Sequence, residues 1–292
     1  MPISKDTKRK ADNKLSQKRG HLVVQRNDFI QKSRHQLSLQ EQKIVLYLIS
    51  HIKPDDVDFT EQVFSIADFC RFCGMDEKNG KNYSDIKNAL GKLRSRYVWV
   101  TLEDGSETTL GWINKATINK NSGLIRLRLD EDLKPFLLLL TEHYTLYEMR
   151  YTLAMKSRYS IRLYELLRSY AYKKSVVFGI DELKRLLDAE NHALNGHFKA
   201  KVLDVAAREI NEYTDISIEY GFQKEGRRFS HVWFNIYHKS TLDRFIAGDK
   251  TDRDIDRKNK SQSVMIPDSV ADIMLNQMRL QPMPGEVTLF PG

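Results

Sequence analysis

Polar and cationic side chains line one side of two predicted helices, in a pattern suited to contacts with nucleic-acid bases. The first helix begins near residue 82 and turns Ile86, Leu90 and Leu93 inward at spacings of three and four. Asn can form two hydrogen bonds to adenine and Lys can donate to guanine, so the opposite side suits base reading. An ordinary solvated helix face is the alternative. The predicted contact residues are Lys81, Asn82, Ser84, Lys87, Asn88 and Lys92.

The second helix, near residues 197–212, repeats this arrangement and adds small residues. Ala200 and Ala207 on its outer side would let the backbone approach base edges closely. Asp204 could accept a hydrogen bond from a cytosine amino group, or pair with Arg208 one helical turn further on. The predicted contact residues are His197, Lys199, Lys201, Asp204 and Arg208.

A cationic turn follows the second helix, between strands predicted over Ile216–Tyr220 and Val232–Tyr237. Adjacent arginines on a turn are rarely buried, and hydrogen bonds to phosphates are a common use of such side chains. Plain surface charge is the alternative. The residues predicted to touch the nucleic-acid backbone are Arg227, Arg228, Ser230 and His231.

Catalytic and metal chemistry find little support in the sequence. Gly80-Lys81 and Gly91-Lys92 lack the upstream glycine and the following hydroxyl of a phosphate-binding P-loop. No two histidines stand two residues apart, the spacing of metal ligands in enzymes that nick DNA. Cys70 and Cys73 have no second ligand pair for zinc, which favours a structural role. We therefore predict a protein with no catalytic centre, no cofactor and no bound metal.

The composition fits a two-domain globular protein with polyanionic partners. The chain has 292 residues, of which 41% are hydrophobic and 29% charged, and its net charge is +8. Nucleic acid and anionic membrane surfaces both attract such a charge. No apolar run is long enough to cross a bilayer. The charged N-terminal sequence is unlike a secretory signal and two cysteines fit a reducing compartment, so a cytoplasmic location is expected.

An internal repeat organises the chain. Phe64-Ser-Ile-Ala-Asp-Phe-Cys-Arg71 returns, 114 residues later, as Phe178-Gly-Ile-Asp-Glu-Leu-Lys-Arg185. In each copy, three predicted helices precede a β-hairpin, which is the order of a winged helix-turn-helix. Helix-turn-helix proteins place a recognition helix in the major groove of DNA. We therefore predict an α+β fold of two tandem winged helix-turn-helix domains related by internal duplication.

Local signals place the elements of the first copy. Ser38 and Glu41 form a capping-box pattern that begins a helix. Leu133–Leu140 is apolar enough to form a helix that lies at an interface within or between chains. The other predicted elements are a helix over Phe64–Cys73, a helix from Asn82 whose apolar face reaches Tyr97, and strands over Val98–Leu102, Thr108–Ile118 and Leu124–Leu129.

Several blocks of the sequence resemble, in the same order, the replication initiators of iteron-containing bacterial plasmids. The resemblance covers about residues 21–240 and includes both predicted winged helices. The blocks that carry it are Val23–Ile30, Leu37–Ile44, Val202–Asn211, Thr214–Tyr220 and Lys224–Phe234.

This resemblance implies a protein that binds directly repeated sites, called iterons, in a plasmid origin. It also implies that the protein helps to open the adjacent AT-rich duplex without an ATPase of its own, together with a host initiator and helicase. A monomer would initiate replication. A dimer joined through the first domain would repress the protein's own promoter or link origins, and so control copy number.

Four segments are expected on these grounds. Residues 1–20 are a basic disordered arm, which either lies against phosphates or is simply solvated. Residues 21–143 form an N-terminal winged-helix domain for dimerisation and DNA contacts. Residues 144–245 form a C-terminal winged-helix domain with the principal DNA-recognition role, and residues 246–292 are a mostly disordered tail.

The tail ends in Glu286-Val-Thr-Leu289-Phe290, which resembles the short motif that binds the bacterial sliding clamp. That motif prefers Gln at its first position, where this chain has Glu. A disordered segment that presents two apolar anchors, Leu289 and Phe290, suits such a groove. A featureless tail is the alternative.

Three other functions are weighed against an initiator. A duplicated winged-helix transcriptional repressor would bind an inverted operator instead of direct repeats. A nicking enzyme would cut supercoiled origin DNA in the presence of a divalent metal. A protein–protein adaptor would work through the apolar Leu133–Leu140 run and the tail, and its helices would bind no DNA.

Overall fold

A computed structural model of the chain describes residues 21–53, 55–66, 69, 82–119 and 121–259. Several predictions fall on residues outside these ranges. They concern Lys81, Cys70, Cys73, the basic arm over 1–20, and the end of the tail with Leu289 and Phe290.

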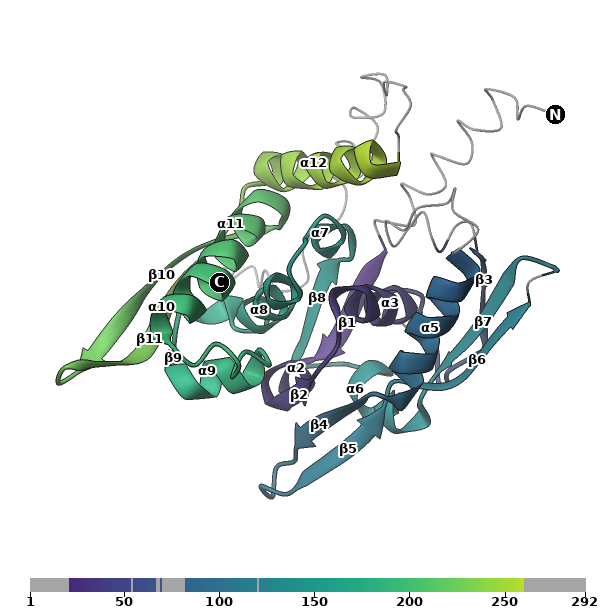
Figure 1. Cartoon of the computed structure of the whole chain (residues 1–292), viewed down its shortest axis with the longest axis horizontal. Helices are drawn as coiled ribbons and strands as arrows, with labels where there is room; N and C mark the ends of the chain where they lie inside the picture. The colour runs from purple at the N-terminus through teal and green to yellow at the C-terminus, as the bar shows by residue number, and fades with distance from the viewer. Residues whose placement is uncertain (1–20, 54, 67–68, 70–81, 120, 260–292) are drawn as a thin grey trace, which may run out of the picture. The chain divides into compact units, whose positions relative to one another are not determined.

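The described chain begins with a two-stranded antiparallel sheet. β1 (Leu22–Arg26) pairs along its whole length with β8 (Tyr144–Glu148), so residues far apart in the sequence lie side by side (Figure 1). α2 (Asn27–Lys32) and the short β2 (Ser33–His35) follow β1. The predicted boundary between residues 143 and 144 falls just before β8, a strand whose partner is β1.

α3 (Leu39–Ile49) has the predicted capping box. The Glu41 backbone N–H donates to Ser38 Oγ at 3.3 Å, and the Ser38 N–H donates to Glu41 Oε2 at 2.7 Å. This reciprocal pair satisfies two donors that a helix start leaves without partners. The helix is buried from Glu41 to Ile49, because other elements surround it on every side.

In the first repeat, the wing sheet has the strand order β3-β7-β6. Its strands are β3 (Gln62–Ser65), β6 (Ile113–Asn119) and β7 (Leu124–Leu129), and α5 (Asn82–Ser95) packs against β6. The helix predicted from Phe64 is therefore wrong at its start. Phe64 belongs to β3, where pairing with Ile125 of β7 outweighs the local helical pattern.

A further hairpin separates α5 from this wing. β4 (Tyr97–Thr101) and β5 (Glu107–Gly111) join β2 in a sheet of order β2-β4-β5. The single strand predicted over Thr108–Ile118 is thus two strands in different sheets, separated by the buried Trp112. The expectation that the apolar face of the preceding helix reaches Tyr97 is also wrong, because Tyr97 lies on β4 and is 55% exposed.

The second repeat has the same plan without the extra hairpin. α8 (Arg158–Ser169), a short 3-10 helix η2 (Ala171–Lys173), β9 (Ser175–Gly179) and α9 (Ile180–Leu186) come first. A continuous helical run follows: α10 (Asn195–Phe198), a π-helical turn η3 (Lys199–Leu203) and α11 (Asp204–Tyr213). β10 (Ile216–Glu225) and β11 (Arg228–His238) then form a long wing in a sheet of order β10-β11-β9.

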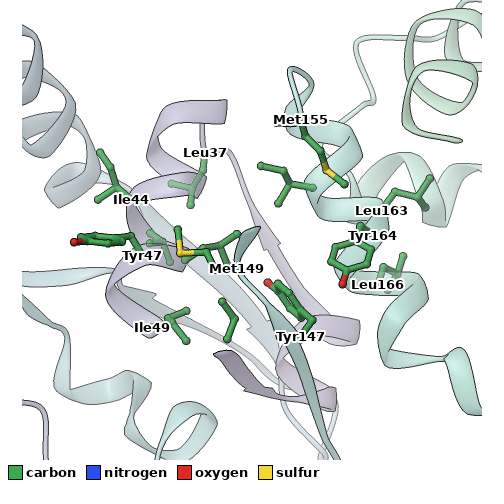
Figure 2. Packing of buried hydrophobic residues seen from close by; sticks show 14 of the residues in the cluster. Leu37, Ile44, Tyr47, Ile49, Tyr147, Met149, Met155, Leu163, Tyr164 and Leu166 are labelled. Carbon is green, nitrogen blue, oxygen red and sulfur yellow. The ribbon is translucent and has the colours of Figure 1, made fainter. Parts of the chain in front are cut away.

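The duplication is visible in the strand pairing and in the core. In each repeat, the strand before the second helix pairs with the second strand of the wing, so Phe64 opposes Ile125 and Phe178 opposes Val232. Figure 2 shows Tyr47 and Ile49 of α3 and the equivalent Tyr164 and Leu166 of α8, 117 residues later, among the buried side chains. Tandem winged helices are thus confirmed as the architecture.

Two other apolar or terminal segments differ from expectation. The expected helix over Leu133–Leu140 is instead the end of a 3-10 helix, η1 (Glu131–Leu133), followed by a single turn, α6 (Lys134–Leu137). Leu133, Leu137 and Leu138 are buried within the chain, α6 contacts β1, and Leu139 is 60% exposed.

The start of the predicted disordered tail is wrong as well. Residues 246–259 belong to α12 (Thr241–Asn259), which packs against α11 and α7 (Arg150–Leu153) (Figure 1). These tertiary contacts support a strongly charged helix that local pattern alone does not predict. None of the helices within the described ranges is long and apolar enough to cross a membrane.

Candidate nucleic-acid interface

α5 presents the predicted polar face to solvent. Ile86, Leu90 and Leu93 are buried against the first repeat, and Ser84, Lys87, Asn88 and Lys92 are exposed on the other sides. Asn82 begins the helix, as expected. The side chains of Ser84, Lys87, Asn88 and Lys92 are therefore available to a ligand, and the contact of this helix with DNA stays a prediction.

Three further cations, which are not among the predicted contact residues, lie on α5 and the first wing. Arg94 at the end of α5 donates from Nη1 to the carbonyl of Asn114 at 2.6 Å, which joins the helix to the start of β6. Lys115 and Arg126 on the wing strands lie 3.9 and 4.0 Å from the Glu61 carboxylate. One acidic side chain thus offsets part of the positive charge of the first wing.

The α10–α11 run also separates an apolar face from a polar one. Phe198, Val202, Ala206 and Ile210 are completely buried. All five predicted contact residues of this run are exposed: His197, Lys199, Lys201, Asp204 and Arg208.

The π-helical turn changes which charged residues meet. The Asp204 backbone N–H donates to the carbonyl of Lys199, five residues earlier, instead of four. Lys199 Nζ then lies 2.9 Å from both carboxylate oxygens of Asp204, and the hydroxyl of Tyr220 donates to Oδ1. Asp204 therefore pairs with Lys199, and the pairing with Arg208 offered by regular helical spacing is not the one formed.

These two donors have an electrostatic consequence. The hydrogen bond from Lys199, and then that from Tyr220, holds the pKa of the Asp204 carboxyl below its ordinary value. Partial burial, and then the hydrogen bond to Asp204, raises the pKa of the Tyr220 hydroxyl, so this phenol stays protonated as a donor. Tyr220 was missed because it lies on β10, 16 residues from Asp204.

The second wing carries the predicted cations at its tip. Gly226 adopts a φ of 61° at the turn, a conformation that glycine takes without strain, and Arg227 and Arg228 beside it are exposed. Ser230 Oγ and His231 Nδ1 are 2.8 Å apart. Two neighbours missed in the sequence, Lys224 and Phe229, add a cation 5.0 Å above an aromatic ring that is 43% exposed.

Side-chain hydrogen bonds hold the helix, the wing and α8 in place. The Asn211 side chain accepts from the Ile218 N–H at 2.6 Å and donates to its carbonyl at 3.0 Å, which joins α11 to β10. The buried Glu209 carboxylate accepts the backbone N–H groups of Lys156 and Ser157, at 3.1 and 3.3 Å. These contacts position a helix and a hairpin together, as groove and backbone binding requires.

In the part of the chain that the structure describes, no group of three or more His, Cys, Asp or Glu side chains is placed to hold a metal ion.

Two protein-family models match the chain in tandem. Residues 22–168 match the one described as Initiator Replication protein, WH1, and residues 179–236 match Initiator Rep protein, WH2. Among 21 matching chains of solved structures is the crystal structure of the Pi initiator protein in complex with iteron DNA. Its alignment covers 76% of this chain and 99% of that one, at 20% sequence identity and a TM-score of 0.60. The likeness to that structure is one of fold.

Proposed function

Because this chain belongs to the initiator replication protein family, we propose that it starts plasmid replication by binding iterons, direct repeats in the origin. The proposal rests on one observation: the exposed cationic helical run α10–α11 is hydrogen-bonded to the cationic β10–β11 wing beside it. The Pi initiator, which has the same fold, is bound to iteron DNA in its crystal structure.

The two elements have different tasks in this proposal. The helix enters the major groove, where each base pair presents a distinct set of donors and acceptors. The wing, with Arg227 and Arg228, contacts phosphates, which adds affinity and orientation without sequence information. α5 and its wing repeat this arrangement on a neighbouring stretch of the same duplex.

Further parts of the proposal concern partners. A dimer joined through the first repeat represses the initiator's own promoter, and the monomer acts at the origin in the cytoplasm. Opening of the AT-rich duplex relies on host initiator and helicase, and uses no catalytic centre of this chain. The Leu289-Phe290 motif binds the sliding clamp.

Binding to repeat arrays tests the central proposal. Protection of origin DNA from cleavage should show a footprint that recurs with the period of the direct repeats. The control is the same half-sites rearranged as inverted pairs, together with a scrambled duplex of equal composition. Preference for inverted pairs would indicate a repressor instead, and equal protection of the scrambled duplex would refute sequence-specific initiation.

The clamp motif has its own test. Purified sliding clamp should be recovered with the wild-type chain and lost with a Leu289→Ala/Phe290→Ala variant, since both apolar anchors are removed. The unchanged iteron footprint of the variant serves as the control. Equal recovery of clamp with both proteins would show that the tail does not bind it.

A further inference from the structure

A three-residue cluster connects the α10–α11 helix to its wing at the exposed surface. Lys199 and Asp204 come from the helix, and Tyr220 comes from β10. The Tyr220 ring packs over the completely buried Phe234, with ring centroids 5.9 Å apart. The phenol therefore has a fixed position from which its hydroxyl reaches Asp204.

The two oxygens of the Asp204 carboxylate have different surroundings. Oδ1 accepts from both Tyr220 and Lys199, whereas Oδ2 accepts from Lys199. The side chains of Lys199 and Asp204 are 51% and 46% exposed. Ion pairs at this level of exposure contribute little stability, so Lys199 can leave Asp204 at small cost when another anion is near. Tyr220 would then still hold Oδ1, and Oδ2 would be open.

We propose that Tyr220 is a specificity-determining residue that positions Asp204 to accept a hydrogen bond from the N4 amino group of a cytosine in the repeat. Lys199 moves from Asp204 to the DNA as the complex forms. The inference rests on the proposed function, since it requires α10–α11 to lie in the major groove, where a carboxylate can accept from cytosine N4.

Lys199 and Asp204 together also carry no net charge in the free protein. The pair therefore adds little to the attraction for arbitrary phosphates, and Lys199 becomes available only where Asp204 gains a different donor. The cluster would in this way favour the cognate repeat and disfavour random duplex.

Binding measured on a repeat in which each C·G pair is replaced singly by U·A tests the role of Tyr220. The replacement turns the cytosine amino group into a uracil carbonyl and adds no methyl, and it also changes the paired guanine to adenine, so the comparison with the variants identifies the contact made by Asp204. At the position whose cytosine amino group Asp204 contacts, the replacement should lower the affinity of the wild-type protein by about five-fold to 150-fold, the range for a base-specific contact. Tyr220→Phe and Asp204→Asn should lose that preference and keep the preferences at all other positions.

Tyr237→Phe is the matched control, because the Tyr237 hydroxyl donates to Glu219 at 3.1 Å on β10, away from Asp204. It should retain the wild-type pattern. Thermal unfolding checks that Tyr220→Phe, which keeps the ring, is folded. If Tyr220→Phe retained every base preference, or weakened all duplexes alike, the inference would be wrong. A wild-type protein with no preference for the repeat over random duplex would instead refute the proposed function.

Asp204→Ala provides a second measurement. Removal of the carboxylate frees Lys199 for phosphates, so affinity for random duplex should rise by about two-fold to ten-fold at low salt, while affinity for the repeat falls. Unchanged or weaker binding to random duplex would contradict the exchange of Lys199 between Asp204 and DNA.

Discussion

At the scale of single residues, the cations of the candidate interface differ in what surrounds them. Lys199 is paired with Asp204, and Lys115 and Arg126 lie near Glu61. Arg227 and Arg228, by contrast, are exposed at a turn beyond the packed part of the wing. This difference agrees with the proposed division of roles, in which Lys199 and Asp204 select a sequence while Arg227 and Arg228 contact the DNA backbone.

We expect Arg227→Ala and Arg228→Ala to weaken binding to repeats and to random duplex by the same factor. Each lost phosphate contact should also lower the slope of log affinity against log salt by about 0.9. Titrations at several salt concentrations measure both effects. Arg253→Ala, on α12, is the control and should leave the slope unchanged. If the substitutions lowered affinity for the repeat alone, the wing would contact bases and not phosphates.

A buried histidine gives a pH prediction that concerns stability. Burial, and then the nearby Arg162, holds the pKa of His35 well below its ordinary value of 6.5. Its Nδ1 has no hydrogen-bond partner within the described part of the chain, and its ring packs edge-on against Trp112. The folded protein therefore binds this proton more weakly than the unfolded chain does.

The free energy of unfolding should fall as pH decreases below about 6.5, by up to about 1.4 kcal/mol per pH unit from this one group. His35→Phe keeps an aromatic ring and removes the titration, so its loss of stability between pH 7.5 and pH 5 should be smaller. Urea unfolding at both values measures the difference. An equal decline in both proteins would rule out His35 as a source of acid sensitivity.

At the scale of elements, α8 connects the two repeats. The buried Arg162 donates to the carbonyls of Ile30, Ser33 and Leu186, at 2.7, 2.6 and 3.3 Å. One turn later, the Glu165 carboxylate accepts from Gln25 of β1 and Tyr147 of β8. A helix of the second repeat thus supplies partners for backbone and side-chain groups of the first.

Arg162→Met should destabilise the protein by about 3–5 kcal/mol, because it leaves the buried carbonyls of Ile30 and Ser33 without this donor and removes a cation that attracts the buried Glu165 carboxylate. The midpoint of urea unfolding should fall while the slope stays the same. Arg185→Met on the exposed side of α9 is the control, with an expected change within about 0.5 kcal/mol. A similarly small change at Arg162 would show that α8 does not depend on this network.

The wing depends on a close contact between its two strands. The Trp233 indole lies over Gly221, so a Cβ at that glycine would lie 2.5 Å from Cζ2 of the ring. Gly221→Ala should therefore displace the indole and cost about 1–3 kcal/mol. Gly196→Ala meets nothing within 4 Å and should be neutral or stabilising. Thermal unfolding compares the two, and equal effects would contradict a specific Trp233 contact.

At the scale of the whole molecule, the question is whether both repeats hold the same DNA. The net charge of +8 favours association with any polyanion, and so does not answer it. The polar face of α5 is exposed in the same way as that of α10–α11. Contacts by α5 would increase the number of DNA phosphates that the protein neutralises, and this number determines how steeply affinity falls with salt.

Lys87→Ala/Lys92→Ala should lower the slope of log affinity against log salt by about 2, since each neutralised phosphate contributes roughly 0.9. Titrations with origin duplex at several salt concentrations measure the slope. The control is a duplex that contains only the part of the site protected by the second repeat. An unchanged slope on the full site would show that the first repeat does not touch DNA through α5.

Patterns within short windows account for the predictions that the structure confirmed. The capping box at Ser38, the apolar stripe of α5 and the glycine turn at Gly226 each depend on residues only a few positions apart. The spacing of Phe64 and Phe178 indicated the duplication, because equivalent positions in two copies of a fold need similar side chains. Local sequence therefore determined the two winged helices and their exposed polar faces.

Only the tertiary structure decided features whose partners lie far along the chain. Phe64 is in a strand because β7 pairs with it, β1 is completed by β8, and residues 246–259 are helical against α7 and α11. The Asp204 contacts depend on a π-helical turn and on Tyr220 of the following strand. The free energy of such contacts comes from residues that are far apart in the sequence. The periodicity of a single helix or strand therefore does not predict them.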